Sequence, residues 1–151
     1  MLGSKVEPTP GNEWELAHSE ITLSEIGRKL FRTKDLKIHL HQMHQDHVVN
    51  APSPDTTDLL EKSAKIHVWG SSEHTKVQGV YLKDRLFTTQ GHLGFNESMV
   101  KRQIDMRIES GGIEDEKHAE EAKESADLKH DGEIVAAAIL RLFHGDDTNI
   151  P

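Results

Sequence analysis

Residues 77–100 read VQGVYLKDRLFTTQGHLGFNESMV, and this stretch decides which kinds of fold the chain can adopt. Apolar and polar residues alternate over 77–82 and again over 85–90, which is the period of a half-buried β-strand. Lys83 and Asp84 separate the two segments, and a connection this short suits a β-hairpin. A helical pattern begins a few residues later, so the second strand leads almost directly into a helix. The stretch therefore predicts a fold that contains both a sheet and helices.

The helix that follows this hairpin is predicted over 97–110. Its apolar face is marked by residues four positions apart, Val100, Ile104 and Ile108. Asn96 and Ser98 are both suitable N-caps, and the pair Gly111-Gly112 ends the pattern. A second, strongly apolar helix is predicted to end at Gly145, and the charged, alanine-rich residues between the two are expected to form a solvated helix or a mobile link.

Three further strands are predicted upstream, near 14–22, 36–41 and 65–70, from the same alternation of apolar and polar residues. All five strands are expected to form one sheet. Two well-defined helices are too few to cover both faces of such a sheet if any of it is parallel, so we expect the chain to be part of a larger domain.

The domain organisation expected from these patterns has three parts. Residues 1–12 are expected to be a flexible segment because Pro and Gly recur among polar residues. Residues 13–112 are expected to hold the sheet and its first helix, and 113–151 the charged link and the C-terminal helix.

Composition excludes several classes of protein. The chain has 151 residues, enough for one ordinary core, and 18 Lys plus Arg against 26 Asp plus Glu give a net charge of -8. This charge repels phosphate backbones and anionic lipids, so we expect neither a nucleic acid nor a membrane as partner. No apolar run approaches the roughly 20 residues of a membrane span, and we expect a cytoplasmic protein. With no cysteine, the chain has neither a disulfide framework nor a cysteine nucleophile.

Histidines are concentrated at the end of the predicted strand 36–41. Four of them and one aspartate fall in the run His39-Leu40-His41-Gln42-Met43-His44-Gln45-Asp46-His47. Imidazole and carboxylate groups bind Zn, Cu, Ni or Fe, but the side chains after His41 would need a helical turn to converge with those before it. A polar strand end in a chain with 11 His is the favoured interpretation of the run, and we assign no metal to it.

A single histidine, His92, lies between Gly91 and Gly94 where the last strand runs into the helix. Folds of the α/β class place catalytic side chains at the carboxyl ends of strands, and an imidazole with a near-neutral pKa suits a general base. A turn residue flanked by conformationally free glycines is the alternative interpretation.

Five short motifs follow one another along the chain: Glu13-Trp14-Glu15, His41-Gln42-Met43-His44-Gln45-Asp46-His47-Val48, Gly70-Ser71-Ser72-Glu73, Val77-Gln78-Gly79 and Thr88-Thr89-Gln90-Gly91-His92. In this order they resemble the C-terminal half of a class I glutamine amidotransferase-like domain, in particular the stand-alone, GMP-synthase-like type found in fungi. The similarity runs from about Trp14 to about Ile108.

The resemblance implies a partial flavodoxin-like α/β sandwich, with a mixed sheet, a β-hairpin and C-terminal helices. In that family a Cys, His and Glu triad hydrolyses the side-chain amide of glutamine, and no cofactor takes part. The catalytic histidine of the family corresponds to His92. The family's loop that lines the glutamine pocket is similar to Met43, His44, Gln45 and Asp46, which we therefore take as candidate substrate-binding residues.

The chain departs from the family at two of the three triad positions. The family reads Gly-His-Pro-Glu-Phe, whereas residues 91–95 read Gly-His-Leu-Gly-Phe, so Gly94 stands where the orienting acid is expected. Without a carboxylate, the imidazole loses its preferred tautomer and the partner of its charged form. Glu97, one helical turn away, is the nearest acid along the chain. Since the cysteine is also absent, we expect a truncated and catalytically incomplete amidotransferase-like protein that is inactive alone.

Two other functions remain open from the sequence. The chain is also consistent with a non-catalytic ligand-binding or scaffold module that uses His44, Asp46 and His92. An unrelated histidine-dependent hydrolase is the third, weaker hypothesis, because no Gly-x-Ser-x-Gly elbow accompanies the available hydroxyl groups. The expected partners are a glutamine-like small molecule and either a missing N-terminal half or a synthase.

Overall fold

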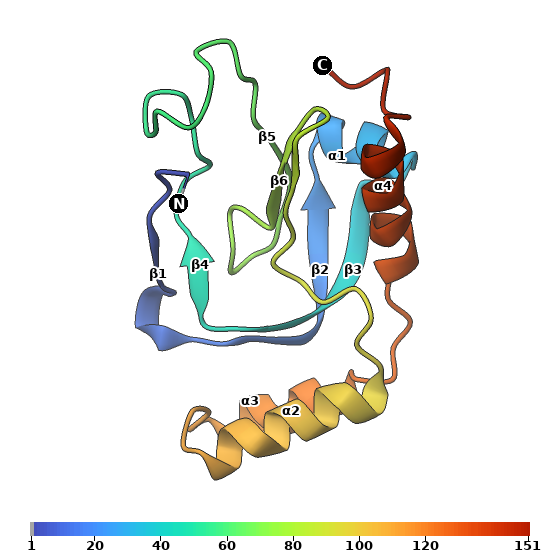
Figure 1. The fold of residues 1–151 in the computed structure, drawn as a ribbon. Coiled ribbons are helices and arrows are strands. Elements are labelled where there is room, and N and C mark those ends of the chain that lie inside the picture. Colours follow the sequence, from blue (N-terminus) through green and yellow to red (C-terminus); the bar gives the residue numbers. More distant parts are fainter. Residues whose placement is uncertain (1) are drawn as a thin grey trace.

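The computed structural model describes residues 2–151, and Figure 1 shows how their helices and strands are arranged. One sheet has the strand order β3-β2-β5-β6-β7, and a separate two-stranded sheet pairs β1 with β4. The strands are β1 (Val6–Pro8), β2 (Glu15–Leu23), β3 (Lys37–His44), β4 (Asp46–Val48), β5 (His67–Ser71), β6 (Gly79–Leu82) and β7 (Leu86–Phe87). The helices are the 3-10 turn η1 (Pro10–Asn12), α1 (Glu25–Phe31), α2 (Glu97–Glu109), α3 (Glu116–Glu124) and α4 (Gly132–His144).

All five strands predicted from the alternation lie in the larger sheet, which confirms an α/β fold. The longest pairing joins β2 to β3, with Glu15 opposite His44 at one end and Thr22 opposite Lys37 at the other. The sheet is not mixed within residues 2–151, contrary to expectation, since each of its four strand pairings is antiparallel. Short loops join β5 to β6 and β6 to β7, and such loops produce antiparallel pairs, whereas parallel pairs need a long crossover.

The N-terminal segment makes backbone pairs that the sequence did not predict. Residues 1–12 are expected to be flexible, but β1 pairs with β4, and the Thr9 amide donates to the Gln45 carbonyl at 2.9 Å. Pro8 is tolerated because it lies at the end of an edge strand. This pairing attaches the first residues to the loop that follows β3.

The main core lies between the sheet and the helices α1 and α4 (Figure 1). Trp69 is fully buried at its centre, and its indole N–H donates to the Thr88 carbonyl at 2.8 Å. A Cβ at Gly79 would lie 2.0 Å from that same carbonyl oxygen and 2.2 Å from the indole nitrogen. Only glycine therefore fits beneath Trp69, which explains the glycine in the middle of a strand-like sequence.

The helix predicted over 97–110 is confirmed as α2. The Asn96 side chain caps it by accepting from the Met99 amide at 3.0 Å. Its two fully buried side chains, Val100 and Ile104, join a second core with α3 and the start of β2. Figure 1 shows α2 and α3 beyond one end of the sheet and not across its face.

The charged stretch after α2 forms a solvated helix, which was one of its two predicted states. Asp115 caps α3 by accepting from the His118 amide at 3.0 Å, and Ala119 and Ala122 form its buried face. Alanine is small enough to let two polar helices approach closely. None of the helices in residues 2–151 has both the length and the apolar composition that crossing a membrane requires.

The second core generates a test of the packing of α2. Ile104→Ala removes a fully buried side chain and is expected to lower the free energy of unfolding by about 2–5 kcal/mol. Met106→Ala, on the same helix but 45% exposed, is expected to cost less than about 1 kcal/mol. Urea unfolding measures both variants, and equal effects would contradict the packing described.

Candidate functional site

His92 lies in the loop after β7 and contacts the outer edge of β3. Its backbone amide donates to the His41 carbonyl at 2.8 Å, which forms an isolated antiparallel bridge. The imidazole stacks on Phe95, with ring centroids 3.9 Å apart and planes within 7°. The preceding residue, Gly91, packs closely against β3, since a Cβ at this position would lie 3.0 Å from the side chain of Leu40. Packing therefore holds the ring without help from a side-chain hydrogen bond.

The electrostatic environment favours the neutral form of this ring. Burial, and then the nearby His44, lower the pKa of His92 below its ordinary value of 6.5. A neutral imidazole at pH 7 can accept a proton, which is the first requirement of a general base.

Two of the four candidate substrate-binding residues, His44 and Asp46, lie together at the end of β3. The imidazole of His44 lies between two acceptors, with Nε2 3.0 Å from Oε2 of Glu15 and Nδ1 donating to the Asp46 carbonyl at 3.0 Å. The Gln90 side chain, two residues before His92, donates to that same carbonyl at 3.1 Å. The loop that contains His92 and the 44–46 loop are thereby joined through the backbone carbonyl of Asp46. Asp46 itself is exposed.

The other two candidates face different surroundings. Gln45 donates to the Asn12 carbonyl at 2.7 Å, which ties it to the N-terminal segment. Met43 packs against the second core, away from His44, because successive residues of a strand point to opposite faces.

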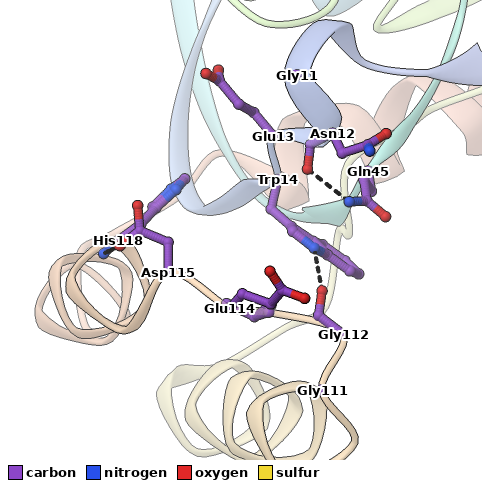
Figure 2. A pocket seen from close by; sticks show the side chains of 11 residues that line it. Gly11, Asn12, Glu13, Trp14, Gln45, Gly111, Gly112, Glu114, Asp115 and His118 are labelled. Atoms are coloured by element: carbon purple, nitrogen blue, oxygen red, sulfur yellow. Dashed lines mark hydrogen bonds between the residues drawn. The ribbon is translucent and has the colours of Figure 1, made fainter.

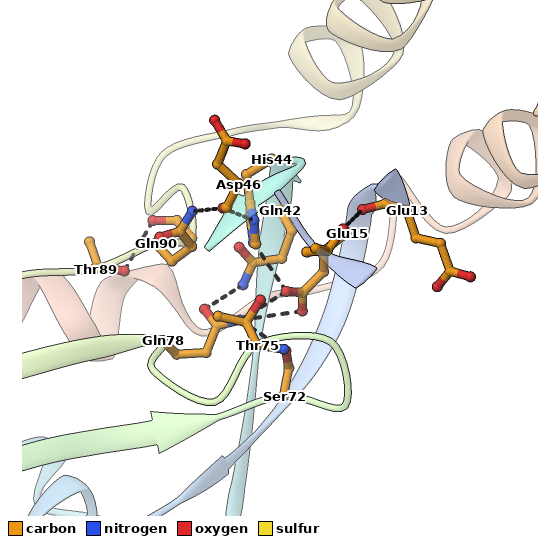
Figure 3. A network of polar contacts seen from close by, with 12 residues as sticks. Glu13, Glu15, Gln42, His44, Asp46, Ser72, Thr75, Gln78, Thr89 and Gln90 are labelled. Atoms are coloured by element: carbon orange, nitrogen blue, oxygen red, sulfur yellow. Dashed lines mark hydrogen bonds and ion pairs between the residues drawn. The ribbon is translucent and has the colours of Figure 1, made fainter. Parts of the chain in front are cut away.

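A buried polar network that the sequence did not predict lies behind His44 (Figure 3). The Gln78 amide donates to both carboxylate oxygens of Glu15, at 3.3 and 3.1 Å, and to Oγ of Ser72 at 3.0 Å. Gln42 in turn donates to Oε1 of Gln78 at 3.0 Å. Glu15 is 1% exposed, and both glutamines are fully buried. The sequence signal belongs to Gln42, which follows Ile38 and Leu40 at a position where the strand alternation calls for an apolar residue.

Glu15 is held in its charged form despite this burial. Burial alone would raise the pKa of Glu15, but hydrogen bonds from His44, Ser72 and Thr75 and the charge of His44 outweigh it, so the pKa falls below 4.5. A buried carboxylate needs such partners, because its transfer from water is costly.

Two cavities flank these residues, and neither is lined by His92. The larger, of about 570 Å³, lies between the segment 11–14, Gln45 and the loop that joins α2 to α3 (Figure 2). Trp14 forms one wall, with its indole N–H donating to the Gly112 carbonyl at 2.8 Å. The second, of about 460 Å³, lies between β2 and the residues after β5, and Glu15 is part of its wall. Neither of these two cavities therefore includes both His92 and the 44–46 loop.

The histidine run over 39–47 does not converge. The alternation of β3 points His39 and His41 to one face and Gln42 and His44 to the other, so the run is divided between two environments. Within residues 2–151, no three His, Asp or Glu side chains are arranged to hold a metal ion.

The position of the expected orienting acid is open. No atom lies within 4 Å of a Cβ built on Gly94, so a larger side chain would fit there. Glu97 does not replace the acid, since it forms an ion pair with Lys101 at 2.7 Å.

Comparisons with known proteins give relatives in sequence and in structure, although no family model matches the chain. A protein of Schizosaccharomyces pombe, provisionally named glutamine amidotransferase-like, is 28% identical over 130 residues, which cover 86% of this chain and 47% of the relative. A protein of Saccharomyces cerevisiae, provisionally named a glutamine amidotransferase, is 28% identical over 142 residues, which cover 94% of this chain and 50% of the relative. The chain therefore spans about half the length of the curated relatives it matches.

Solved structures agree on the fold. A glutamine amidotransferase from Thermotoga maritima matches 97% of this chain and 56% of its own, with a TM-score of 0.60 and 18% identity. A glutamine amido transferase from Methylobacillus flagellatus matches 95% of this chain and 54% of its own, with a TM-score of 0.61 and 18% identity. At these identities the likeness concerns the fold.

The buried network generates a test at Glu15. Glu15→Ala leaves His44 and Gln78 without their acceptor and is expected to lower the free energy of unfolding by about 3–5 kcal/mol at pH 7. Glu13→Ala, at an exposed position of the same segment, is expected to change it by less than about 0.5 kcal/mol.

The depressed pKa of Glu15 also gives this stabilisation a pH dependence. The contribution is complete above the unfolded value of about 4.5 and is lost as the pH falls through the lower folded pKa. Unfolding measured from pH 7 to 3 is expected to show a weaker acid dependence in Glu15→Gln than in the wild type. Identical profiles would mean that Glu15 is not held as a carboxylate.

Proposed function

We propose that this chain, which has the fold of a class I glutamine amidotransferase-like domain, contributes the general base and part of the substrate pocket of a glutamine-hydrolysing site. The observation that carries the proposal is the attachment of the His92 loop to the end of β3 beside the 44–46 loop. Two segments far apart in sequence, each matched to a functional motif of the family, are held there by direct hydrogen bonds.

His92 is the proposed general base and acid. In the mechanism that the family resemblance implies, the imidazole takes the proton of a cysteine thiol, and the thiolate attacks the side-chain carbonyl carbon of glutamine. The tetrahedral intermediate then expels ammonia, which leaves with the proton from the imidazole, and water hydrolyses the thioester to glutamate. The lowered pKa of His92 suits the first of these steps.

The 44–46 loop is the proposed contact with the main-chain groups of the substrate. Asp46 presents an exposed carboxylate next to the carbonyl that binds both His44 and Gln90, and an α-ammonium group is the natural ligand of such a carboxylate. His44 has an oxygen 3.0 Å from each of its ring nitrogens, which restrains the orientation of the ring at the start of the loop.

These 151 residues supply neither of the other two triad members. The sequence contains no cysteine, and within residues 2–151 no carboxylate forms an ion pair with the His92 ring. A hydroxyl group is a poor substitute for the thiol, since its pKa is far higher and it needs a well-oriented base. We therefore infer that hydrolysis requires a thiol from outside these residues.

The sheet offers a place for a partner that supplies the thiol. β7 is the last strand of the order, and no strand of residues 2–151 pairs with its outer side. An edge strand presents unpaired backbone groups that accept another strand. We infer that the partner is the other half of a glutamine amidotransferase-like domain, since the chain aligns with about half of each relative.

The first test uses the chain by itself. The wild-type chain and Gly94→Glu are both expected to release no ammonia from glutamine above background, because triad members act as a unit and the nucleophile is absent. The open space at Gly94 makes a folded variant the expected result. Turnover that survives repurification and disappears in His92→Ala would show that another residue of this chain is the nucleophile.

The second test supplies the missing chemistry in trans. The chain is mixed with, or fused to, the cysteine-bearing half of the Saccharomyces cerevisiae relative, and glutaminase activity is measured. His92→Ala is expected to lower kcat by about 10²–10⁴-fold. His118→Ala, a control at the larger cavity, is expected to leave kcat unchanged. An active complex that is indifferent to His92→Ala would contradict the proposal.

A ligand-binding module without turnover is the second candidate, and Gly94 in the place of the acid favours it. Titration of the chain with glutamine by NMR distinguishes the two. Binding that Asp46→Asn abolishes, together with an inactive reconstituted complex, would support the module.

A further inference from the structure

Four histidine side chains that the proposed site does not use gather on one face of the paired strands β2 and β3. They are His18 on β2, His39 and His41 on β3, and His130 just before α4. The rings of His18 and His39 stack at 4.6 Å between centroids, His18 lies 6.0 Å from His41, and His41 lies 4.8 Å from His130. Histidine is the side chain whose charge changes most readily near physiological pH.

These histidines hold the segment 129–132, which leads into α4, against the sheet. The Asp131 amide donates to the His39 carbonyl at 2.8 Å, and the His39 amide donates to the Asp131 carboxylate at 2.8 Å. The His18 ring donates through Nε2 to the Lys129 carbonyl at 3.0 Å. Because Asp131 binds β3, its side chain makes no capping bond to α4, whose first turn depends on this attachment.

The contact of His130 requires a neutral ring. The Gly132 amide donates to Nδ1 of His130 at 3.1 Å, and a nitrogen that accepts a hydrogen bond cannot also carry a proton. Gly132 is also packed tightly, since a Cβ there would lie 2.0 Å from the Leu93 carbonyl oxygen. Leu93 directly follows His92, so the segment 129–132 supports the loop of the candidate base as well as α4.

His41 is the most enclosed member of the cluster. It is 1% exposed, and among residues 2–151 its Nδ1 has no hydrogen-bond partner. The titratable groups that face it from neighbouring elements are His18, His130 and His92, all bases. The acidic groups of this region face His39 instead, Asp131 at 4.0 Å and Glu20 from β2. A proton on His41 would therefore be buried without a counter-charge.

We propose that His41 and His130 form a pH-sensitive latch, which holds the segment 129–132 on β3 through their neutral rings and releases it when His41, which has no counter-charge, takes up a proton. Release frees the first turn of α4 and the backbone that supports the His92 loop. The latch stands independently of the function proposed above, since it concerns the attachment of α4 whatever the loop does.

The size of the effect follows from linkage. Burial first, and then the charges of His130 and His18, lower the pKa of His41 from 6.5 to about 4. If the released segment exposes His41 to water, the ratio of open to closed molecules rises by about 30-fold between pH 7.5 and 5. The sign is that of a base with a depressed pKa, so the closed form is lost as the pH falls below 6.5.

Amide hydrogen exchange measured by NMR on the full chain tests the latch. The protection of the Asp131 and Gly132 amides, corrected for intrinsic exchange, is expected to fall about 30-fold from pH 7.5 to 5. The Ser24 amide, which donates to the Trp69 carbonyl in the main core, is the internal reference and is expected to change less than about 3-fold. Unchanged protection at Asp131, or an equal loss at Ser24, would overturn the proposal.

Variants identify the groups responsible. In His41→Gln, the pH dependence of protection at the Asp131 amide is expected to fall below about 3-fold. The control His144→Gln changes an exposed histidine on α4 and is expected to behave as the wild type. If His41→Gln does not fold, His130→Asn replaces it, because the asparagine oxygen can accept from the Gly132 amide but carries no charge. A wild-type pH dependence in the folded variant would overturn the proposal.

Discussion

The buried carboxylate of Glu15 is the constraint on which the rest of the structure depends. An ionised group at this depth is tolerable only when its oxygens are surrounded by donors, and those donors come from two separate parts of the chain. His44 approaches from the end of β3, and Ser72 and Gln78 approach from the two ends of the loop between β5 and β6. Satisfying one charge therefore fixes where the last residues of β3 lie, and the His92 loop is bonded to that same strand.

Local pattern was sufficient to predict most of the elements. Alternating residues predicted the strands of the larger sheet, and Asn96 predicted the start of α2, because strand faces and helix caps are set by neighbours along the chain. The pairing of β1 with β4 joins residues about forty positions apart, and no local signal encodes it. The packing of α2 against α3 was also not predicted. The buried face of α3 is formed by Ala119 and Ala122, and alanine contributes little to a hydrophobic pattern.

The candidate site was also predictable only in part. The family motifs indicated the His92 loop and the 44–46 loop, and the structure brings these two loops together. The roles of Glu15, Gln42 and Gln78 were not predictable, because each depends on the register between strands that pair far apart in sequence. The two-residue period of β3 assigns the members of the histidine run to opposite faces of the strand.

The two edges of the sheet differ in how they are protected. On the β3 side, the carbonyl groups of His41 and His39 are already occupied by the amides of His92 and Asp131, residues that come from distant loops. A further strand cannot add there without displacing them, which blocks edge-to-edge aggregation on that side. Within residues 2–151 the outer side of β7 has no such cover, so self-association would be directed to that edge, and any strand that paired with β7 would also protect the chain from aggregation.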